Sequence, residues 1–392
     1  MRAKYSIAVV VSLAAVAASA APCPPGLAEI AARVAALRAV TGPFAPPCRT
    51  VDAAQLRAEL DRKLRRDLPI APERYLEALV RTGFVDGEPA AVYRHLLDFY
   101  CSQVLGFYEP EGDEMVIVDS GDGPRVDASL VWSHELEHAV QEHRFHLPSR
   151  LLAMRGDSDR QRAASAVAEG EAMLVMLLLN GSSQGGGEAL DRAAAAIEHE
   201  GEQLDVPGVP DFFVRDLVFP YSAGLTAVLR AYRAGSWRQV DTLLAHPPAS
   251  TAALLHPGAA RPEPAVATDA LPPVPRGWEE VLTDTIGEWG LAFLLGRRLP
   301  PAQAGALAAA WDGDRVRLVR SVAQPEWWAL AWRIRCHDEP GRLALEGELQ
   351  RTLPGLAARL APADRLRFSW SASGRTLDVR AAWPPPSPRS PS

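Results

Sequence analysis

The stretch WSHELEHAVQEH, residues 132–143, places two histidines four positions apart, with a glutamate directly after the first. On an α-helix, residues i and i+4 lie one turn apart on the same face. His134 and His138 can therefore present two imidazole nitrogens to one metal ion. Glu135 is rotated by about 100° from His134, so it lies beside such an ion, where a carboxylate can accept a proton from a bound water. The stretch predicts a buried helix that carries a metal site.

The same spacing is the HExxH pattern of zinc metalloproteases, in which zinc lowers the pKa of a bound water to about 7. The alternative is a charged helix face on which Glu135, Glu137 and Glu142 are solvated. The segment also carries five apolar residues, Leu130, Val131, Leu136, Ala139 and Val140. This composition favours a buried active-site helix, with Zn²⁺ as the metal and Glu135 as the general base.

A catalytic zinc ion needs a third protein ligand and an open coordination position. Gln141 and Arg144 stand where a ligand further along the same helix would require a glycine and a histidine. Glu169, in VAEGEAML, belongs to the next strongly helical segment and has small or apolar neighbours, where an unpaired carboxylate is costly. Glu171 is the alternative third ligand. The two glutamates are separated by about 200° of helix rotation, so they cannot both face the same ion.

HELEH (134–138) and AEGEA (168–172) together resemble the HExxH and NEGFA motifs of the aminopeptidase-type gluzincins. In that family the glutamate before the glycine is a zinc ligand, which implies that Glu169 is the third ligand here. FPYSAGL, residues 219–225, resembles the PYxKG segment of those enzymes and implies that Tyr221 stabilises the oxyanion. A preplaced donor beside the metal is chemically reasonable for that role. On its own, Tyr221 would be interpreted as an ordinary core tyrosine.

A closer resemblance is to bacterial exported proteins with a peptidase MA-like domain. GFYEP, HELEHAVQEHRF and PPASTAALLHP carry it over residues 106–257, and GEW and WDGDR extend it weakly. Two gluzincin elements are missing. No GxMEN exopeptidase signature precedes His134, so the resemblance implies an endopeptidase rather than an aminopeptidase. Met173 stands where the thermolysin-type ExxxD motif has an aspartate, so the residue that orients a histidine ligand is unidentified.

The start of the chain has the pattern of a signal peptide. Arg2 and Lys4 precede a short apolar run that ends in Ala18, Ser19 and Ala20. No other uncharged run is long enough to predict a stable membrane anchor. The net charge of −7 argues against a nucleic-acid partner, which would need a basic surface. We therefore expect an exported protein, periplasmic or extracellular.

These patterns predict an α+β fold with a zincin-like, mostly helical metallopeptidase body, a small β-sheet, and a smaller α+β C-terminal region. The predicted parts are a signal peptide at 1–20, a helical N-terminal region at 21–100, a zincin-like core at 101–257, a Pro/Ala-rich connector at 258–277, an α+β region at 278–384 and a disordered tail at 385–392. The helical periodicity of residues 21–100 fits either a removable propeptide or a permanent subdomain.

Several local structures follow from the same patterns. Two β-rich runs around EPEGDE predict a hairpin, and EMVIVDS (114–120) is a candidate edge strand for an extended substrate. Residues 247–275 are expected to be extended, 278–298 helical, and 365–383 a final hairpin. The many tryptophans of the C-terminal region predict a packed core, with an aromatic binding surface as the alternative. WDGDR is interpreted as a plain turn rather than a calcium-like one.

Export makes the four cysteines candidates for disulfides. Four cysteines allow three pairings, and the sequence cannot choose among them. Our preferred pairing joins Cys23 to Cys48, which closes a local loop, and Cys101 to Cys336. The absence of CxxC spacing argues against a cysteine zinc site or a thioredoxin-like redox site.

The function expected from the sequence is a zinc metallopeptidase acting on a peptide or protein substrate. His134, His138 and Glu169 hold Zn²⁺ in this interpretation, and Glu135 and Tyr221 act in catalysis. Two alternatives stay open. The first is a non-catalytic zincin-fold binding or scaffold protein, in which zinc is structural or absent. The second is a zinc hydrolase of a non-peptide amide or ester.

Overall fold

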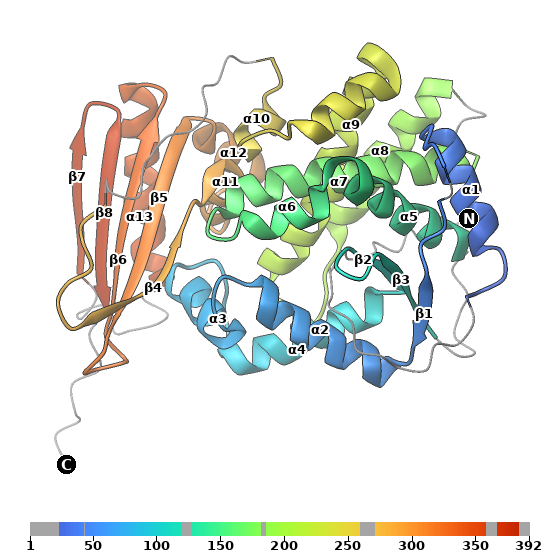
Figure 1. The fold of residues 1–392 in the computed structure, drawn as a ribbon. Coiled ribbons are helices and arrows are strands. Elements are labelled where there is room, and N and C mark those ends of the chain that lie inside the picture. Colours follow the sequence, from blue (N-terminus) through green and yellow to red (C-terminus); the bar gives the residue numbers. More distant parts are fainter. Residues whose placement is uncertain are drawn as a thin grey trace. The chain divides into compact units, whose positions relative to one another are not determined.

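The computed structural model describes residues 23–42, 44–119, 128–181, 186–258, 271–357 and 367–383. The predicted signal peptide, the tail at 385–392 and most of the Pro/Ala-rich connector lie outside these residues. The chain forms two compact units, each assembled from three separate segments (Figure 1). Unit 1 comprises residues 1–67, 94–153 and 163–248, and unit 2 comprises residues 68–93, 154–162 and 249–392. Both are mixtures of helices and strands, so the α+β class is confirmed.

Unit 1 contains a three-stranded sheet of β1 (Cys48–Val51), β2 (Gly106–Glu109) and β3 (Glu114–Val118). Strands β2 and β3 form the predicted antiparallel hairpin, and β1, which was not predicted, pairs in parallel with β3. Strand β3 is therefore central, and the prediction that EMVIVDS forms an edge strand was wrong. Its long-range pairing with β1 occupies the side that was expected to be free.

The helices of unit 1 cover both faces of this sheet. They are α1 (Leu27–Leu37), α2 (Ala53–Asp67), α5 (Ala128–Phe145), α6 (Leu147–Ala153), α8 (Gly186–Gln203), α9 (Asp211–Ala245), and most of α4 (Pro89–Gln103) and α7 (Ser158–Leu179). Met115 on β3 packs with residues of α1 and α5, whereas its neighbour Val116 packs with residues of α2 and α4. Successive strand residues point to opposite faces, so a sheet buried on both sides needs an uninterrupted apolar run such as MVIV.

Helix α5 owes its position to this packing. Leu136, Ala139 and Val140 are buried in the same core as Met115 and Ile117 of β3. The apolar residues of the HELEH segment therefore face the sheet, as their composition predicted. Residues 133–141 of the helix are all buried, so their polar side chains must find partners inside the protein.

Helix α9 is long and apolar enough to cross a membrane by length and composition, but 61% of its most apolar window is buried inside the protein. That burial is typical of a core helix. Non-helical backbone at Gly235 and Ser236 divides it near its C-terminal end.

Unit 2 is built on an antiparallel sheet with the strand order β4-β5-β6-β8-β7 (Figure 1). The strands are β4 (Trp278–Asp284), β5 (Trp311–Ser321), β6 (Trp328–Cys336), β7 (Arg367–Ser373) and β8 (Thr376–Trp383). The helices are α3 (Pro72–Arg81), α10 (Thr251–Leu255), α11 (Gly287–Gly296), α12 (Pro301–Ala308) and α13 (Glu339–Ala357). The final hairpin, β7–β8, is confirmed.

Two predictions in unit 2 were wrong in part. Residues 278–284 form strand β4 rather than the start of a helix, because WEEVLTD pairs with β5 and the helix begins only at Gly287. Residues 251–255, expected to be extended, form the short helix α10. Ser250 caps it by accepting a hydrogen bond from the backbone N–H of Ala253.

The WDGDR segment begins strand β5 rather than forming the plain turn that was expected, and it has a structural role. Asp314 is buried, and its carboxylate accepts hydrogen bonds from the backbone N–H groups of Ile286 and Gly287 and from the indole N–H groups of Trp311 and Trp332, at 2.8–3.1 Å. These four donors use the bonding capacity of both carboxylate oxygens, which leaves none for a calcium ion. Asp314 thus anchors the start of α11 and two core tryptophans. Trp328 and Trp383 are buried as well, as expected for a packed core.

One of the two predicted disulfides is present. Cys23 forms a disulfide with Cys48. Cys23 lies four residues before the start of α1, and Cys48 is the first residue of β1. Cys101 and Cys336 are free, so the second predicted pairing was wrong. Cys101 lies on α4 within unit 1, and Cys336 is buried at the end of β6 in the sheet of unit 2.

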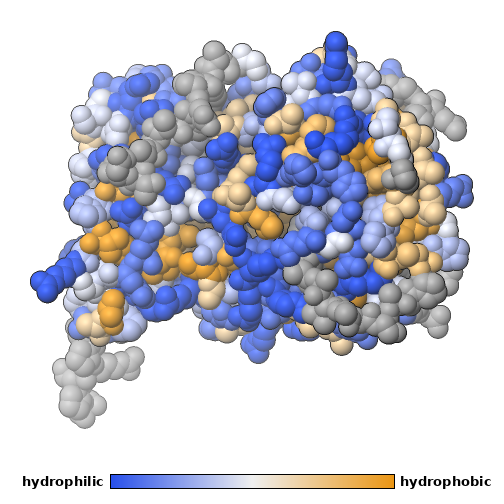
Figure 2. Space-filling view, in the orientation of Figure 1, coloured by the Kyte–Doolittle hydropathy of each residue, from blue (hydrophilic) through white to orange (hydrophobic). Residues whose placement is uncertain are grey.

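Hydrophilic residues cover most of the face drawn in Figure 2, and hydrophobic residues gather in smaller patches among them. Such a surface is ordinary for a globular protein. The candidate metal ligands His134, His138 and Glu169 are instead buried in the interior.

Candidate metal centre

Helix α5 buries both histidines of the HELEH segment. The exposed fractions of His134 and His138 are 2% and 1%, and the two Nε2 atoms are 3.1 Å apart. The helical spacing predicted that both rings would face one point, and the structure places them so.

Helix α7 brings Glu169 to the same point. Its Oε2 atom lies 3.1 Å from Nε2 of His134 and 3.7 Å from Nε2 of His138. Among the residues that the structure describes, this is the one group of three histidine, cysteine or acidic side chains whose donor atoms are close enough to share a metal ion. A tetrahedral ion with bonds of about 2.0–2.1 Å needs donor atoms about 3.3 Å apart, and the three separations bracket that value. The donor set therefore fits zinc.

A close crossing of α7 and α9 brings the remaining predicted residue to the cluster. A Cβ atom on Gly224 would lie 1.8 Å from the carbonyl oxygen of Ala166, and one on Gly170 would lie 2.1 Å from the carbonyl carbon of Gly224. Only glycine allows the two backbones to come this close. The glycines of AEGEA and FPYSAGL are thus required by packing, one residue after Glu169 and three after Tyr221.

Tyr221 is buried beside the histidines. Its ring stacks on that of His134 with a centroid separation of 6.0 Å. Burial, together with the charge of Glu169, raises the pKa of the Tyr221 hydroxyl well above its ordinary value, so the phenol stays a hydrogen-bond donor. Its hydroxyl has no hydrogen-bond partner among the described residues.

Glu135 is fully buried next to this tyrosine and the histidines. Its Oε2 atom accepts a hydrogen bond of 3.1 Å from the backbone N–H of Tyr108 on β2, and its Oε1 atom has no partner in the described part of the chain. Burial raises the pKa of Glu135, although the neighbouring imidazoles oppose the shift. Buried polar atoms are nearly always paired, so unpartnered atoms on both Glu135 and Tyr221 indicate that a polar ligand belongs here.

The electrostatics of the cluster favour a positive charge at its centre. Burial alone would lower the pKa of His138, but the charge of Glu169 outweighs it and raises this pKa to about 9. Burial alone would raise the pKa of Glu169, but the two imidazoles hold it at about 2. The carboxylate is therefore ionised, and either protons on the rings or a metal cation can balance it.

Sequence reasoning missed Gln141, which is the residue that orients His138. Its Oε1 atom lies 2.9 Å from Nδ1 of His138, and its Nε2 atom donates to Oε2 of Glu171 at 2.7 Å and to the carbonyl oxygen of Ala168 at 2.8 Å. The i+3 spacing from His138 was the available signal. Gln141 had been considered only as the residue that excludes a glycine.

Glu171, the alternative third ligand, faces a different set of partners. It lies 2.7 Å from Nε of Arg38, whose guanidinium is also bonded to Glu137 at 2.9 Å. Burial and the charge of Glu171 raise the pKa of Glu137 well above its ordinary range. As the helix rotation predicted, Glu169 and Glu171 point to different places, and Glu169 is the one beside the histidines.

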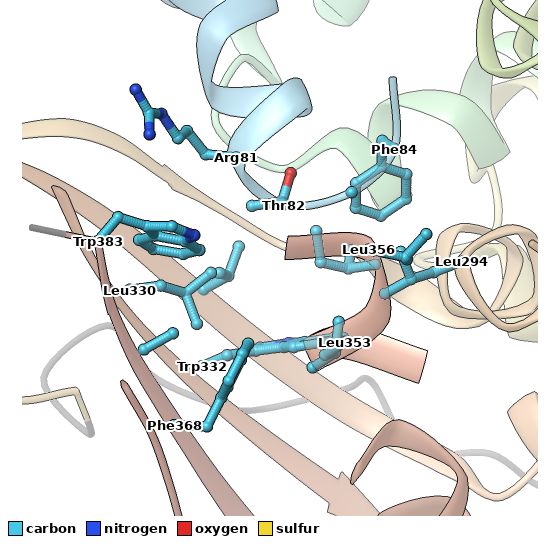
Figure 3. Close-up of a pocket in the computed structure, with 14 residues that line it drawn as sticks. Arg81, Thr82, Phe84, Leu294, Leu330, Trp332, Leu353, Leu356, Phe368 and Trp383 are labelled. Atoms are coloured by element: carbon cyan, nitrogen blue, oxygen red, sulfur yellow. The ribbon is translucent and has the colours of Figure 1, made fainter. Parts of the chain in front are cut away.

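A small cavity in unit 2 has no comparable chemistry (Figure 3). Its volume of about 20 Å³ is bounded mainly by apolar side chains, among them Phe84, Leu330, Trp332 and Leu353. A space of this size holds about one water molecule, and such an apolar void stays dry. It is a small packing gap in the core.

No protein-family model matches the chain, and no curated protein or solved structure is significantly similar to it.

The helix crossing gives the first prediction. Gly224→Ala should lower the free energy of unfolding by about 2–3 kcal/mol, because the added methyl group must push the backbone of α7 away. Urea unfolding measures this loss. Gly347→Ala on α13 is the control, since a Cβ there meets nothing within 4 Å. That control should be neutral or up to about 1 kcal/mol more stable. Equal stabilities of the Gly224 variant and the wild type would contradict the close crossing.

Proposed function

We propose that this protein is an exported zinc metallopeptidase with a zincin-like core, in which His134, His138 and Glu169 hold the metal. The observation that carries the proposal is the convergence of three metal-binding side chains with two unpartnered buried polar atoms, on Glu135 and Tyr221. Two imidazoles and one carboxylate are a ligand set of catalytic zinc sites. When bound by these residues, zinc would lower the pKa of a water molecule and polarise a substrate carbonyl.

Glu135 moves the protons of the reaction. Its Oε2 atom is held by the N–H group of Tyr108, which fixes the carboxylate and leaves Oε1 without a partner. The carboxylate takes a proton from the attacking water and then delivers it to the departing amine. A carboxylate fixed beside the metal site, with one free oxygen, is placed to act as a general base.

Tyr221 supports the negative charge that develops on the carbonyl oxygen. The phenol is protonated, buried and held against the ring of His134. A donor fixed in advance in a water-poor site stabilises such a charge without having to reorganise.

The motif resemblance supports peptides as the substrate class, since HELEH, AEGEA and FPYSAGL together resemble gluzincin peptidases. The disulfide between Cys23 and Cys48 supports export, because such bonds persist in oxidising compartments. One observation favours a second candidate, a structural zinc in a non-catalytic protein. The cluster is almost completely buried, as structural sites are. Measurement of turnover separates the two.

Replacing Glu135 by Gln tests the catalytic role. The variant should bind zinc as the wild type does but hydrolyse peptide bonds at least about 100-fold more slowly, because the amide cannot accept the proton. The measurement is cleavage of a fluorescently labelled unfolded protein by the mature chain. Glu200→Gln, an exposed change on α8, is the control and should keep full activity. Undiminished hydrolysis by the Glu135 variant would exclude this mechanism.

Tyr221→Phe keeps the ring that stacks on His134 and removes only the hydroxyl. We expect unchanged zinc content and a fall in kcat of about 100-fold or more, with little change in KM, because the lost hydrogen bond forms mainly in the transition state. Steady-state kinetics on a peptide substrate measure both constants. An unchanged kcat would mean that Tyr221 is only a core tyrosine.

A further inference from the structure

Arg38, the residue that follows α1, is connected to the metal centre through two intervening side chains. The first link is the hydrogen bond between Nδ1 of His138 and Oε1 of Gln141. Gln141 Nε2 faces two acceptors, the Glu171 carboxylate and the Ala168 carbonyl, so the amide can point only this way. Its oxygen can only accept, and Nδ1 of His138 must therefore carry the proton. In the neutral ring, this leaves the lone pair of Nε2 facing the cluster.

The second link is the ion pair between Arg38 and Glu171, the carboxylate that accepts the hydrogen bond from Gln141 Nε2. Glu171 pairs with the guanidinium of Arg38, and both side chains are completely buried. The same guanidinium pairs with Glu137 at 2.9 Å and Asp241 at 2.8 Å and lies 4.1 Å above the ring of Trp237. Within the described residues, Arg38 is the one cation paired with Glu137 or Glu171. A single buried guanidinium thus collects acidic side chains from α5, α7 and α9.

We propose that Arg38 is a positioning residue of the metal centre, acting through Glu171 and Gln141 on His138, so that residues 23–51 are a permanent part of the centre and not a removable propeptide. The inference rests on the proposed metal site. Arg38 contacts none of the three candidate ligands, whereas an inhibitory segment would be expected to place a group at the metal itself. Arg38 instead contacts Glu137, Glu171 and Asp241, none of which is a candidate ligand.

Two further features build residues 23–51 into unit 1. Strand β1 pairs with the central strand β3 over four residue pairs, from Cys48–Met115 to Val51–Val118. The disulfide of Cys23 with Cys48 joins the two ends of this segment. Removal of the segment would leave the carboxylates of Glu137 and Glu171 close together inside the protein without their cation, which buried acids tolerate poorly.

The test is the zinc dissociation constant of the mature chain, measured by competition with a chromogenic chelator. Arg38→Met and Gln141→Ala should each weaken zinc binding by about 10–100-fold, the usual effect of losing a group that orients a ligand. Arg38→Lys keeps the charge but cannot reach three carboxylates at once, so its affinity should lie in between. Arg33→Met removes an exposed arginine of α1 as the matched control and should bind zinc as the wild type does.

A spectroscopic readout separates positioning from general destabilisation. In zinc-loaded protein with ¹⁵N-labelled histidine, the Nδ1 proton of His138 should give a slowly exchanging, hydrogen-bonded resonance. In Arg38→Met and Gln141→Ala that resonance should move and exchange faster. Wild-type affinity together with an unchanged resonance in both variants would overturn the proposal.

A cleavage experiment tests the segment as a whole and does not depend on the folding of Arg38→Met. A specific protease site placed at residues 39–42 allows the chain to be cut while Cys23–Cys48 still holds α1. Reduction with a phosphine should then release α1 and weaken zinc binding, whereas the uncut, reduced chain should keep its affinity. Full affinity in the cut, reduced chain overturns the proposal.

If the wild type binds no zinc, both the proposed function and this inference fail. If the wild type binds zinc and every variant matches it, only this inference fails.

Discussion

Two imidazole nitrogens 3.1 Å apart in a buried site are the constraint on which the account depends. Because Oε1 of Gln141 accepts a hydrogen bond from Nδ1 of His138, the proton of the neutral ring lies on Nδ1. A neutral His138 therefore presents the lone pair of Nε2 to its neighbour. Nε2 of His134 lies 3.1 Å both from this lone pair and from Oε2 of the ionised Glu169, so a cation or a proton must lie between them. The favourable arrangements are therefore a proton on Nε2 of one of the rings or a bound metal ion. The unpartnered atoms of Glu135 and Tyr221 favour the metal, because protons on the rings would leave these atoms unsatisfied.

The fold holds this arrangement by burying residues 133–141 of α5. The apolar residues of that helix pack against a sheet that is itself covered on its other face by α2 and α4. The polar residues of α5 contact α7. Helix α7 in turn packs closely against α9, the helix of Tyr221, where Gly170 and Gly224 allow the two backbones to approach. Arg38 pairs with acidic side chains of three helices around it. The apolar packing sets where α5 lies, and the ion pairs set how its polar side chains are turned.

The sequence predicted the parts of the site that depend on local spacing. The i+4 spacing placed His134 and His138 on one face, and helix rotation separated Glu169 from Glu171. The structure puts these side chains where that reasoning expected, while their binding of zinc stays a prediction. Arg38 could not be found in this way, because it lies about 100 positions from the helix that it supports and has no motif of its own. Its contacts exist only once the fold is formed.

The errors have the same origin. Strand β1 has four residues next to a Pro-rich stretch, and its partner β3 is distant in sequence, so neither its pairing nor the central place of β3 had a local signal. The pairing of Cys101 with Cys336 was wrong because the two residues belong to different units, with Cys101 partly buried in unit 1 and Cys336 buried in unit 2. Residues 278–284 form a strand through pairing with β5, which overrides any local helical tendency.

The most direct test of the central claim is the metal content of the purified mature chain. It should be measured by mass spectrometry on protein prepared without chelators and offered zinc, for the wild type beside Glu169→Ala. The account predicts about one zinc per chain in the wild type and a large loss in the variant, since the two remaining ligands hold the ion poorly. A wild type that stays free of zinc would contradict the account. The buried cluster would then be an ion pair between histidine and glutamate, and the protein would be better sought among binding modules.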